Sequence, residues 1–434
     1  GGQTPLKIAK ALECGGMRIL GTSVSSIDLA EDREKFDELV KDLKPLNLKQ
    51  PESAIARTAE EAMECAKHLG YPVLVRPSYV LGGKGMRIVR NDIDMNQWIH
   101  EAIHVSDTHP VLIDSFLDRA TEVDVDAISD GHDTFIGGLM EHIEEAGIHS
   151  GDSACSLPPV TLSVAVCDRI RTFTRELAKR LKVIGLMNVQ FAVQGDDIFL
   201  LEVNPRASRT VPFVSKAIGK PLARIAIKVM LGKSLHDLGI REDLDTKLTT
   251  FNVKAPVFPF SKFPGVDVLL GPEMKSTGEV MGRGRSFAEA YAKAMLAAGS
   301  PLPQSGTVFL SIRNEDKAEI LPIAKRLKDM GFNLCATSGT ADFLNNHDLG
   351  SSRINKVKEG SPHCVESIKE GKFAIVINTV SDEQAVKDSF SIRRAALERK
   401  IPYSTVVSAA RAMIEAIHFR RDGPLEILPL QKEG

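Results

Sequence analysis

The sequence predicts an α/β and α+β protein in which a long mixed region precedes a domain with a doubly wound parallel sheet. Two observations support this fold class. Short apolar runs alternate with helix-length amphipathic stretches along most of the chain. The alternation becomes strict after SPLPQSG at 300–306, a segment rich in Pro and Ser that is typical of a linker. Because 434 residues are enough for two to four domains, we expect a linker at 300–306 and a compact domain at 307–434.

The first elements are predicted from their turns and caps. Residues 1–29 are expected to hold a helix and then the strand MRILGTS, which together form part of an α/β unit. A Gly-Gly turn such as the one at the start normally follows a strand, so we expect the chain to be cut from something longer. The next helix is predicted over 25–43, with Asp28 or a nearby Ser as its cap. Another is predicted over 58–70, because that stretch begins with Thr and ends with Gly.

The remaining elements alternate between strands and helices. YPVLVRPSYVLGGKGMRIVR predicts two strands around a glycine-rich loop, and LMNVQFAVQGDDIFLLEVNP predicts two strands joined near Gly195. A helical stretch, the extended segment VKAPVFPFSKFPG and a helix over 286–299 complete the mixed region. Beyond the linker, helices such as the one over 382–400 separate four predicted strands, which are TVFLSI, NLCATS, FAIVINTV and YSTVVS.

The composition argues against nucleic acid as a partner and against a membrane or oxidising location. The formal net charge is −2 and both signs are interspersed, so the chain has no basic field for binding nucleic acid. No apolar run reaches the ~20 residues that a membrane-spanning helix needs, and no signal peptide is present. The six cysteines are scattered without a CxxC pair, which predicts neither a zinc site nor disulfides and indicates a reducing, cytoplasmic location.

Polar residues directly follow the apolar run FLL in the stretch FLLEVNPRASRTVPFVSKA at 199–217. If residues 195–197 form a three-residue loop, Gln190 faces Glu202 across a hairpin, and Asn204 points to the same face. Three oxygen-bearing side chains then converge, and oxygen ligands suit Mg²⁺ or Mn²⁺. The alternative is a polar sheet face turned to solvent, but the position of the whole set beside FLL favours a metal.

The loop in RPSYVLGGKGMRIV at 76–89 has the features of a flap that covers phosphates. Its glycines let backbone N–H groups approach a ligand, and Arg76 and Lys84 bring positive charge. A plain β-turn explains the glycines equally well when they are taken alone. The predicted metal site further along the chain favours the interpretation as a flap, since a bound nucleotide needs both a cation and a loop that closes over its phosphates.

The polar stretch MEHIEEAGIHSGDSACSLPP at 140–159 is, by itself, either a surface excursion or the wall of a site. Together with RPSYVLGGKGM, GLMNVQFAV and EVNPRASRTVPFVSKA, it resembles the large subunit of carbamoyl phosphate synthetase, and the likeness runs through essentially all 434 residues. The resemblance is to the C-terminal half of that subunit. It implies a remnant of a pre-ATP-grasp subdomain at 1–29, an ATP-grasp domain at 30–299, and a methylglyoxal-synthase-like allosteric domain at 307–434.

The resemblance also implies a reaction. In this family the second ATP-grasp module phosphorylates carbamate to carbamoyl phosphate, which serves the pyrimidine and arginine pathways. The implied partners are the N-terminal half of the large subunit and a glutaminase small subunit, with ATP and Mg²⁺ or Mn²⁺ as cofactors. Two alternatives stay open: another ATP-grasp carboxylate–amine ligase, or an inactive nucleotide-binding or regulatory fragment.

The family's functional residues carry over onto this sequence motif by motif. The implied catalytic residues are Arg206, Arg209 and His149, and the implied metal ligands are Gln190, Glu202 and Asn204. The ATP-binding set, which includes Gln190, Glu202 and His149, is completed by Arg76, Gly82, Gly83, Ser115, Leu117, Glu122, Gly147, Ile148 and Ser150. Glu144 and Asp152 match acidic partners of ornithine, although Ala255 and Pro256 stand where ornithine-activated relatives carry a Glu.

The last domain is expected to bind a nucleotide effector such as UMP or IMP. The resemblance places this site at Thr337, Thr340, Lys356, Asn378 and Thr379. Helix N-termini at the ends of parallel strands favour phosphate, and a lysine adds a full charge. The alternative is that Thr340 and Ser381 simply cap helices. NNHDLGSSR stands where methylglyoxal synthase has a Gly-Gly-Asp segment, so a catalytic role of this domain is not expected.

Overall fold

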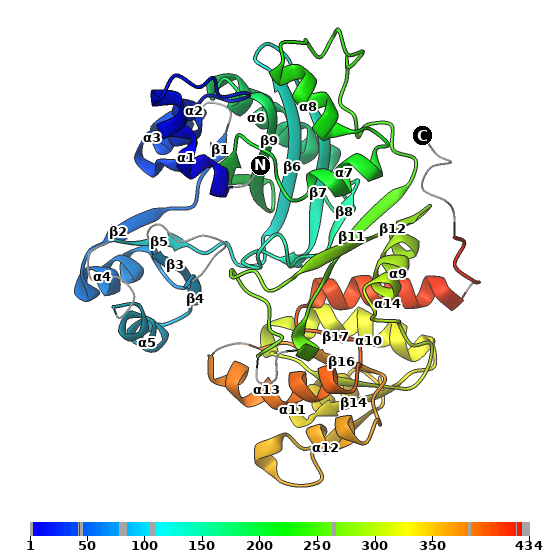
Figure 1. Cartoon of the computed structure of the whole chain (residues 1–434). Helices are drawn as coiled ribbons and strands as arrows, with labels where there is room; N and C mark the ends of the chain where they lie inside the picture. The colour runs from blue at the N-terminus through cyan, green and yellow to red at the C-terminus, as the bar shows by residue number, and fades with distance from the viewer. Residues whose placement is uncertain are drawn as a thin grey trace.

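The fold contains three β-sheets (Figure 1). The computed structural model describes residues 3–41, 43, 47–77, 85–103, 110–262, 266–380, 383–421 and 423–427. Among these residues, an eight-stranded sheet forms the centre of the N-terminal part, and a four-stranded sheet lies beside it. A five-stranded sheet forms the C-terminal part.

The eight-stranded sheet lies between two layers of helices. Helices α3 (Arg33–Lys41) and α6 (Val164–Arg180) pack on one face, while α7 (Val211–Ala217) and α8 (Leu222–Met230) pack on the other. Among the described strands of this sheet, only β1 and β10 pair in parallel. In sheet order the strands are β1 (Leu48–Lys49), β10 (Asp197–Asn204), β9 (Ile184–Gln194), β6 (Thr121–Asp130), β7 (Thr134–Glu145), β8 (Cys155–Leu157), β11 (Phe251–Val257) and β12 (Gly278–Gly284).

The N-terminal segment differs from the sequence prediction in three respects. The predicted strand at 17–23 does not form, and α1 (Gln3–Cys14) is followed by exposed, non-regular chain, with Met17 63% exposed. The helix predicted over 25–43 is two helices, α2 (Val24–Glu31) and α3, because Asp32 adopts an extended conformation. The cap is Ser23, not Asp28, and its hydroxyl accepts a hydrogen bond from the Ser26 amide.

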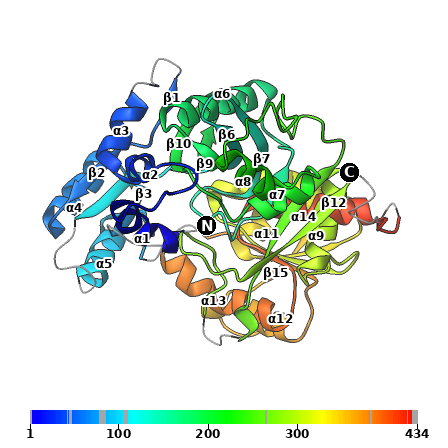
Figure 2. The ribbon, with the colours of Figure 1, turned by 45° about the horizontal axis from the view of Figure 1, so that its top comes forward.

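The four-stranded sheet forms a separate subdomain, labelled β2 to β5, α4 and α5 in Figure 1, whose colour runs from blue to cyan. Figure 2 shows the same part turned by 45°. Its strands, in order, are β2 (Ser53–Ala56), β5 (Val111–Ser115), β3 (Val73–Pro77) and β4 (Arg87–Val89). Helices α4 (Ala59–Leu69) and α5 (Asp92–Ile103) pack on it through a core that includes Trp98. The prediction for 58–70 is confirmed, since Thr58 caps α4 and Gly70 ends it at φ 80°.

The predicted doubly wound parallel sheet is confirmed. Its strands, in order, are β15 (Ser351–Ile354), β14 (Asn333–Thr337), β13 (Thr307–Ser311), β16 (Ile375–Asn378) and β17 (Tyr403–Ser404), and all neighbours are parallel. Side chains alternate along β13, so Val308 and Leu310 face one helical layer and Phe309 faces the other. The first layer holds α10 (Lys317–Asp329), α11 (Ser338–Asn345) and α14 (Val407–Arg421), and the second holds α12 (Cys364–Lys369) and α13 (Glu383–Glu398).

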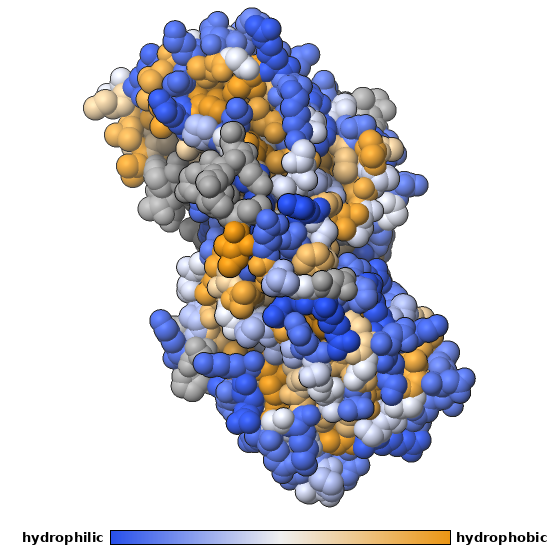
Figure 3. All heavy atoms as spheres, turned by 90° about the vertical axis from the view of Figure 1, so that its right-hand side faces the viewer, coloured by the Kyte–Doolittle hydropathy of each residue, from blue (hydrophilic) through white to orange (hydrophobic). Residues whose placement is uncertain are grey.

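A single hydrophobic core connects the eight-stranded sheet with the C-terminal sheet. Helix α9 (Phe287–Ala297) packs against β11 and β12 on one side and against α14 on the other. Leu302, within the predicted linker, is 4% exposed and belongs to this same core. Leu302 therefore anchors the segment 300–306, whose other residues are exposed or half-buried, and its carbonyl accepts a hydrogen bond from Arg420. On the face drawn in Figure 3, hydrophilic residues separate several groups of apolar ones.

Candidate functional site

The hairpin β9–β10 brings Gln190 opposite Glu202, as predicted, but by a different route. The turn is one residue shorter than expected, because Gln194 already pairs with Asp197. A β-bulge at Leu201 then shifts the register by one residue, which restores the pairing of Gln190 with Glu202. The bulge explains why Leu201 of an otherwise apolar run is 36% exposed.

The three predicted metal ligands lie on this hairpin with suitable chemistry. Glu202 is exposed, and Asn204 accepts a hydrogen bond from Arg206 on its side-chain oxygen at 2.7 Å. Gln190 donates to the Ser150 hydroxyl at 3.3 Å. One carboxylate and two amide oxygens form an incomplete set that suits Mg²⁺ once phosphate oxygens and water are added. Within the described residues, no group of three His, Cys, Asp or Glu side chains forms a metal site without such help.

The turn after β7 is built from the predicted nucleotide-binding residues. Gly147 has φ 96°, and its N–H donates to the Glu122 carboxylate at 3.0 Å, which joins two residues predicted to contact ATP. His149 Nδ1 accepts a hydrogen bond from the Gly151 amide at 3.0 Å. Burial lowers the pKa of His149, and the nearby positive charge of Arg209 acts in the same direction. His149 is therefore neutral at physiological pH.

Behind this turn lies a buried charged network that the sequence prediction missed. His142 Nε2 lies 2.9 Å from Asp124, and its Nδ1 lies 3.6 Å from Glu122. Burial alone would lower the pKa of His142, but the two carboxylates raise it. Burial raises the pKa of Glu122, while the hydrogen bond from His142 holds the pKa of Asp124 below its usual value despite burial. The missed signal was the pair of charged residues at alternate positions in the apolar strand VDVD, Asp124 and Asp126, together with the charged residues Glu141, His142 and Glu144 within the strand MEHIE.

The acidic residues assigned to ornithine have structural partners. Both carboxylate oxygens of Asp152 accept backbone N–H groups, from Lys275 at 2.7 Å and Ser276 at 2.8 Å, and Asp152 is fully buried. Glu144 accepts the Ala154 amide at 2.7 Å. An ornithine site at Glu144 and Asp152 stays a prediction, and the two backbone bonds do not preclude it, because each carboxylate oxygen can accept a second hydrogen bond.

Glu144 should make stability depend on pH. Burial raises the pKa of Glu144 to about 7, so the folded chain holds a proton that the unfolded chain releases near pH 4.5. The stabilisation from this proton is complete below pH 4.5 and is lost as pH rises through 7. Replacing Glu144 by Gln should therefore raise the free energy of unfolding, relative to the parent, by about 1–3 kcal/mol more at pH 8 than at pH 5. Urea unfolding at both pH values measures this; an equal difference at the two would contradict it.

The remaining ATP-binding predictions lie on the four-stranded subdomain and its connection to β6. Arg76 pairs with Asp114 at 3.1 Å, so its guanidinium is already aligned by an acidic neighbour. Ser115 ends β5, and Leu117 follows in the connection to β6. Gly82 and Gly83 lie outside the described residues. The flap prediction is therefore untested.

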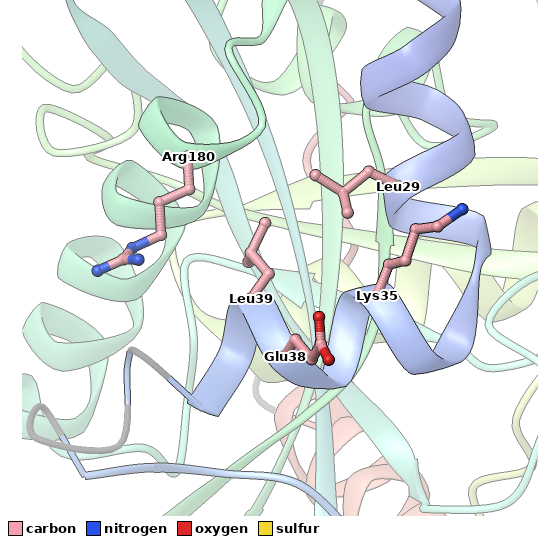
Figure 4. A pocket seen from close by; sticks show the side chains of 5 residues that line it. All are labelled: Leu29, Lys35, Glu38, Leu39 and Arg180. Atoms are coloured by element: carbon pink, nitrogen blue, oxygen red, sulfur yellow. The ribbon is translucent and has the colours of Figure 1, made fainter.

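A cavity of about 370 Å³ opens where the two parts of the chain meet. Phe116, Gly147 and Ile148 line it from the predicted nucleotide side, while Arg313 and Asp316 line it from the C-terminal part. A second, shallow pocket lies on α2, α3 and α6 and is lined by Leu29, Lys35, Glu38, Leu39 and Arg180 (Figure 4). Because none of those five is a predicted site residue, the shallow pocket has no part in the chemistry considered below.

The predicted effector residues gather at the carboxyl edge of the C-terminal sheet. Thr340 accepts the Ile312 amide and Thr379 accepts the Arg313 amide, both at 3.0 Å. Thr337 and Asn378 end β14 and β16, the two strands that flank β13 and its last residue Ser311, and Lys356 lies two residues beyond the end of β15. Thr340 lies inside α11 and caps nothing, whereas Ser381 is outside the described residues. Strand β15 itself was not predicted.

Comparison with known proteins agrees with this arrangement. Residues 32–238 match the family described as carbamoyl-phosphate synthase L chain, ATP binding domain, and residues 319–405 match the MGS-like domain. The chain is 54% identical over 432 residues to the carbamoyl phosphate synthase large chain of Pasteurella multocida, covering 99% of this chain and 40% of that protein. It is 53% identical over 440 residues to that of Xanthomonas axonopodis, again covering 40% of the relative. The chain thus spans well under half the length of these relatives.

Solved structures show the fold at much lower identity. The biotin carboxylase of Campylobacter jejuni, in complex with an ATP analogue, has a TM-score of 0.54 and 17% identity and covers 67% of this chain and 71% of its own. The biotin carboxylase domain of Hydrogenobacter thermophilus 2-oxoglutarate carboxylase, solved with MgADP and bicarbonate, has a TM-score of 0.53 at 17% identity and covers 66% of this chain and 69% of its own. None of the helices within the described residues is both long and apolar enough to cross a membrane. The two matched domains and the long identical stretches place the chain in the carbamoyl phosphate synthase large-chain family, as an ATP-grasp domain joined to an MGS-like domain.

Proposed function

We propose that the chain phosphorylates carbamate with ATP to give carbamoyl phosphate and ADP, the last step of carbamoyl phosphate synthesis for the pyrimidine and arginine pathways. The observation that carries this proposal is the contact of Gln190 with Ser150. It joins the hairpin that bears Glu202 to the turn that bears His149, so the metal face and the candidate catalytic histidine belong to one site.

The reaction requires two anions to meet. A carbamate oxygen attacks the γ-phosphorus of ATP, and the bond from that phosphorus to the oxygen shared with the β-phosphate breaks, which releases ADP. Arg206, Arg209 and Arg76 provide positive charge for this encounter. When bound, Mg²⁺ or Mn²⁺ at Gln190, Glu202 and Asn204 would neutralise further phosphate charge. His149, whose pKa is lowered, offers a neutral hydrogen-bonding group instead of another charge.

The reverse reaction tests this proposal directly. Purified chain is mixed with ADP, carbamoyl phosphate and Mg²⁺, and ATP formation is followed with a coupled assay; Mn²⁺ replaces Mg²⁺ in a second series. ATP formation that depends on both substrates supports the proposal. Tight ADP binding without ATP formation would favour a nucleotide-binding or regulatory fragment. ATP-dependent coupling of another carboxylate to an amine, without this reverse activity, would favour a different ligase.

The wider assignments follow from the same proposal. The N-terminal half of the large chain and a glutaminase small subunit would supply carbamate, since this substrate decomposes in water and needs a protected source. The MGS-like domain would bind a nucleoside monophosphate such as UMP or IMP and regulate the reaction. The compartment we propose is the cytoplasm, where nucleotides, metals and reduced cysteines coexist.

Replacing Lys356 by Ala should weaken binding of the nucleoside monophosphate. Lys356 is exposed and lies two residues beyond β15, whose last residue, Ile354, pairs with Thr337 at the end of β14, so Lys356 can reach a phosphate bound at this edge of the sheet. Loss of one charge-assisted contact should cost about 1–2 kcal/mol of binding free energy. Calorimetric titration of the whole chain with UMP and with IMP measures it, and Lys369→Ala, an exposed lysine on α12, is the control. Equal affinities of the Lys356 and Lys369 variants would contradict the assignment.

A further inference from the structure

The connection between β11 and β12 reaches from the candidate site to the C-terminal domain. Its described residues 266–277 contain no helix or strand, yet both ends are held by specific contacts. We call these residues the strap. In Figure 1 the chain leaving β11 runs down toward α13 before it returns to β12.

One end of the strap is fixed by a buried ion pair with α13. Arg393, which is 1% exposed, donates from Nε to Asp267 at 2.8 Å and from a terminal nitrogen to the second carboxylate oxygen. Its remaining donors reach the Ser389 hydroxyl and the Val386 carbonyl within α13. Burial would raise the pKa of Asp267, but Arg393 holds it below its usual value. Losing one partner would leave the other charge buried and uncompensated.

The middle of the strap is closed on itself by a lysine. Lys275 Nζ donates to the Asp267 carbonyl at 3.2 Å and to the Leu269 carbonyl at 2.7 Å. These bonds tie the residue that meets α13 to the residue that meets the candidate site. A displacement of residues 267–269 is therefore passed to Lys275 through these two hydrogen bonds.

The other end of the strap holds the His149 turn. The His149 amide donates to the Gly271 carbonyl at 2.8 Å, and the Ser276 hydroxyl donates to the Gly151 carbonyl at 3.0 Å. The amides of Lys275 and Ser276 donate to the fully buried Asp152. Because both of these amides belong to the strap, the Asp152 carboxylate fastens the strap to the turn.

We infer that the strap positions His149 for phosphoryl transfer and that the Arg393–Asp267 ion pair in the other domain sets this position. The inference rests on the proposed function for the role of His149. Within the described residues, Arg393 and Asp267 contact each other and not His149, while the Asp152 amide donates to the His149 carbonyl at 2.7 Å; all three act through other groups and are positioning residues. Helix α13 also follows Asn378 and Thr379 in the chain, so a ligand at the effector residues would act on the same helix that holds the strap.

The test compares Arg393→Gln with Arg171→Gln in the full chain. Arg171 forms a comparably buried ion pair with Asp245, away from the strap, so its variant controls for the general loss of such a pair. In Arg393→Gln, amide hydrogen exchange at His149, Lys275 and Ser276 should accelerate ~10-fold or more, because their acceptors are no longer held in place. The reverse turnover should fall ~10-fold with less than ~3-fold change in the KM for ADP. Arg393→Lys, which keeps the charge, should recover part of both.

Each outcome decides a separate point. Unchanged exchange at the three amides in Arg393→Gln, or equal acceleration in Arg171→Gln, would overturn the strap inference. If the parent chain has no reverse activity, the proposed function fails, while the exchange measurements still test the mechanical link. Should Arg393→Gln not fold, Asp267→Asn, which conserves shape and removes only the charge, replaces it with the same expected pattern.

Discussion

Replacing Glu202 by Gln should reduce ATP formation from ADP and carbamoyl phosphate at least ~100-fold, which corresponds to about 2.7 kcal/mol of activation free energy. Glu202 is the one carboxylate of the three predicted metal ligands, and it pairs with Gln190 across the hairpin. An amide keeps the shape but loses the negative charge that would bind the metal. Because Glu202 is exposed, folding should change little, and thermal unfolding should be close to that of the parent.

The control for Glu202 comes from the same hairpin. Asp196 lies in the two-residue turn at the far end of β9 and β10 and also carries an exposed carboxylate. Asp196→Asn should leave turnover within ~2-fold of the parent, because surface substitutions away from a site have small effects. Raising the Mg²⁺ concentration should partly restore Glu202→Gln if weak metal binding is the cause. Near-normal turnover of Glu202→Gln would exclude this residue as a metal ligand.

Replacing Gly282 by Ala should be the most destabilising of these changes, by more than ~3 kcal/mol, because overpacking against backbone cannot be relieved by a side-chain rotation. Gly282 lies in β12, where the backbone of α9 crosses the sheet. A Cβ at this position would lie 2.5 Å from the Ala294 nitrogen and still closer to the Ala290 oxygen. The whole of α9 would have to move away from β12.

Gly278 is the matched control for Gly282. It begins the same strand, and a Cβ there meets no heavy atom within 4 Å. Gly278→Ala should therefore change the free energy of unfolding by less than about 0.5 kcal/mol. Chemical denaturation of both variants and the parent measures the difference. Similar stability of the two variants would show that α9 and β12 do not approach as closely as described.

Sequence reasoning correctly predicted the elements that are determined by residues close together in the chain. The cap and stop of α4 and the alternation of the C-terminal sheet are examples, since neither needs a distant partner. The pairing of Gln190 with Glu202 was also right, although a shorter turn and a bulge replaced the expected three-residue loop. The shorter turn and the bulge shift the register by one residue in opposite directions, so their effects cancel. The alternation of side chains along a strand gives no sign of either change.

The features that sequence reasoning missed depend on contacts between distant residues. The apolar stretch at 17–23 has the composition of a strand, but a strand also needs a hydrogen-bonding partner, and these residues remain unpaired and partly exposed. Strand β15 has a polar sequence and exists because it pairs with β14. The His142–Asp124 pair and the role of Asp152 became visible only when strands separated in sequence were placed together.

The core that runs without a break from β11 through α9 to α14 has a consequence for cooperativity. Tyr291 and Ala294 of α9 pack in the same cluster as Met413 and Ile417 of α14, so neither domain completes its interior alone. Unfolding one domain would expose this shared surface on the other and destabilise it at the same time. The two domains should therefore unfold in one cooperative transition. Separating them at 300–306 would expose the shared apolar surface on both fragments and make them prone to aggregation.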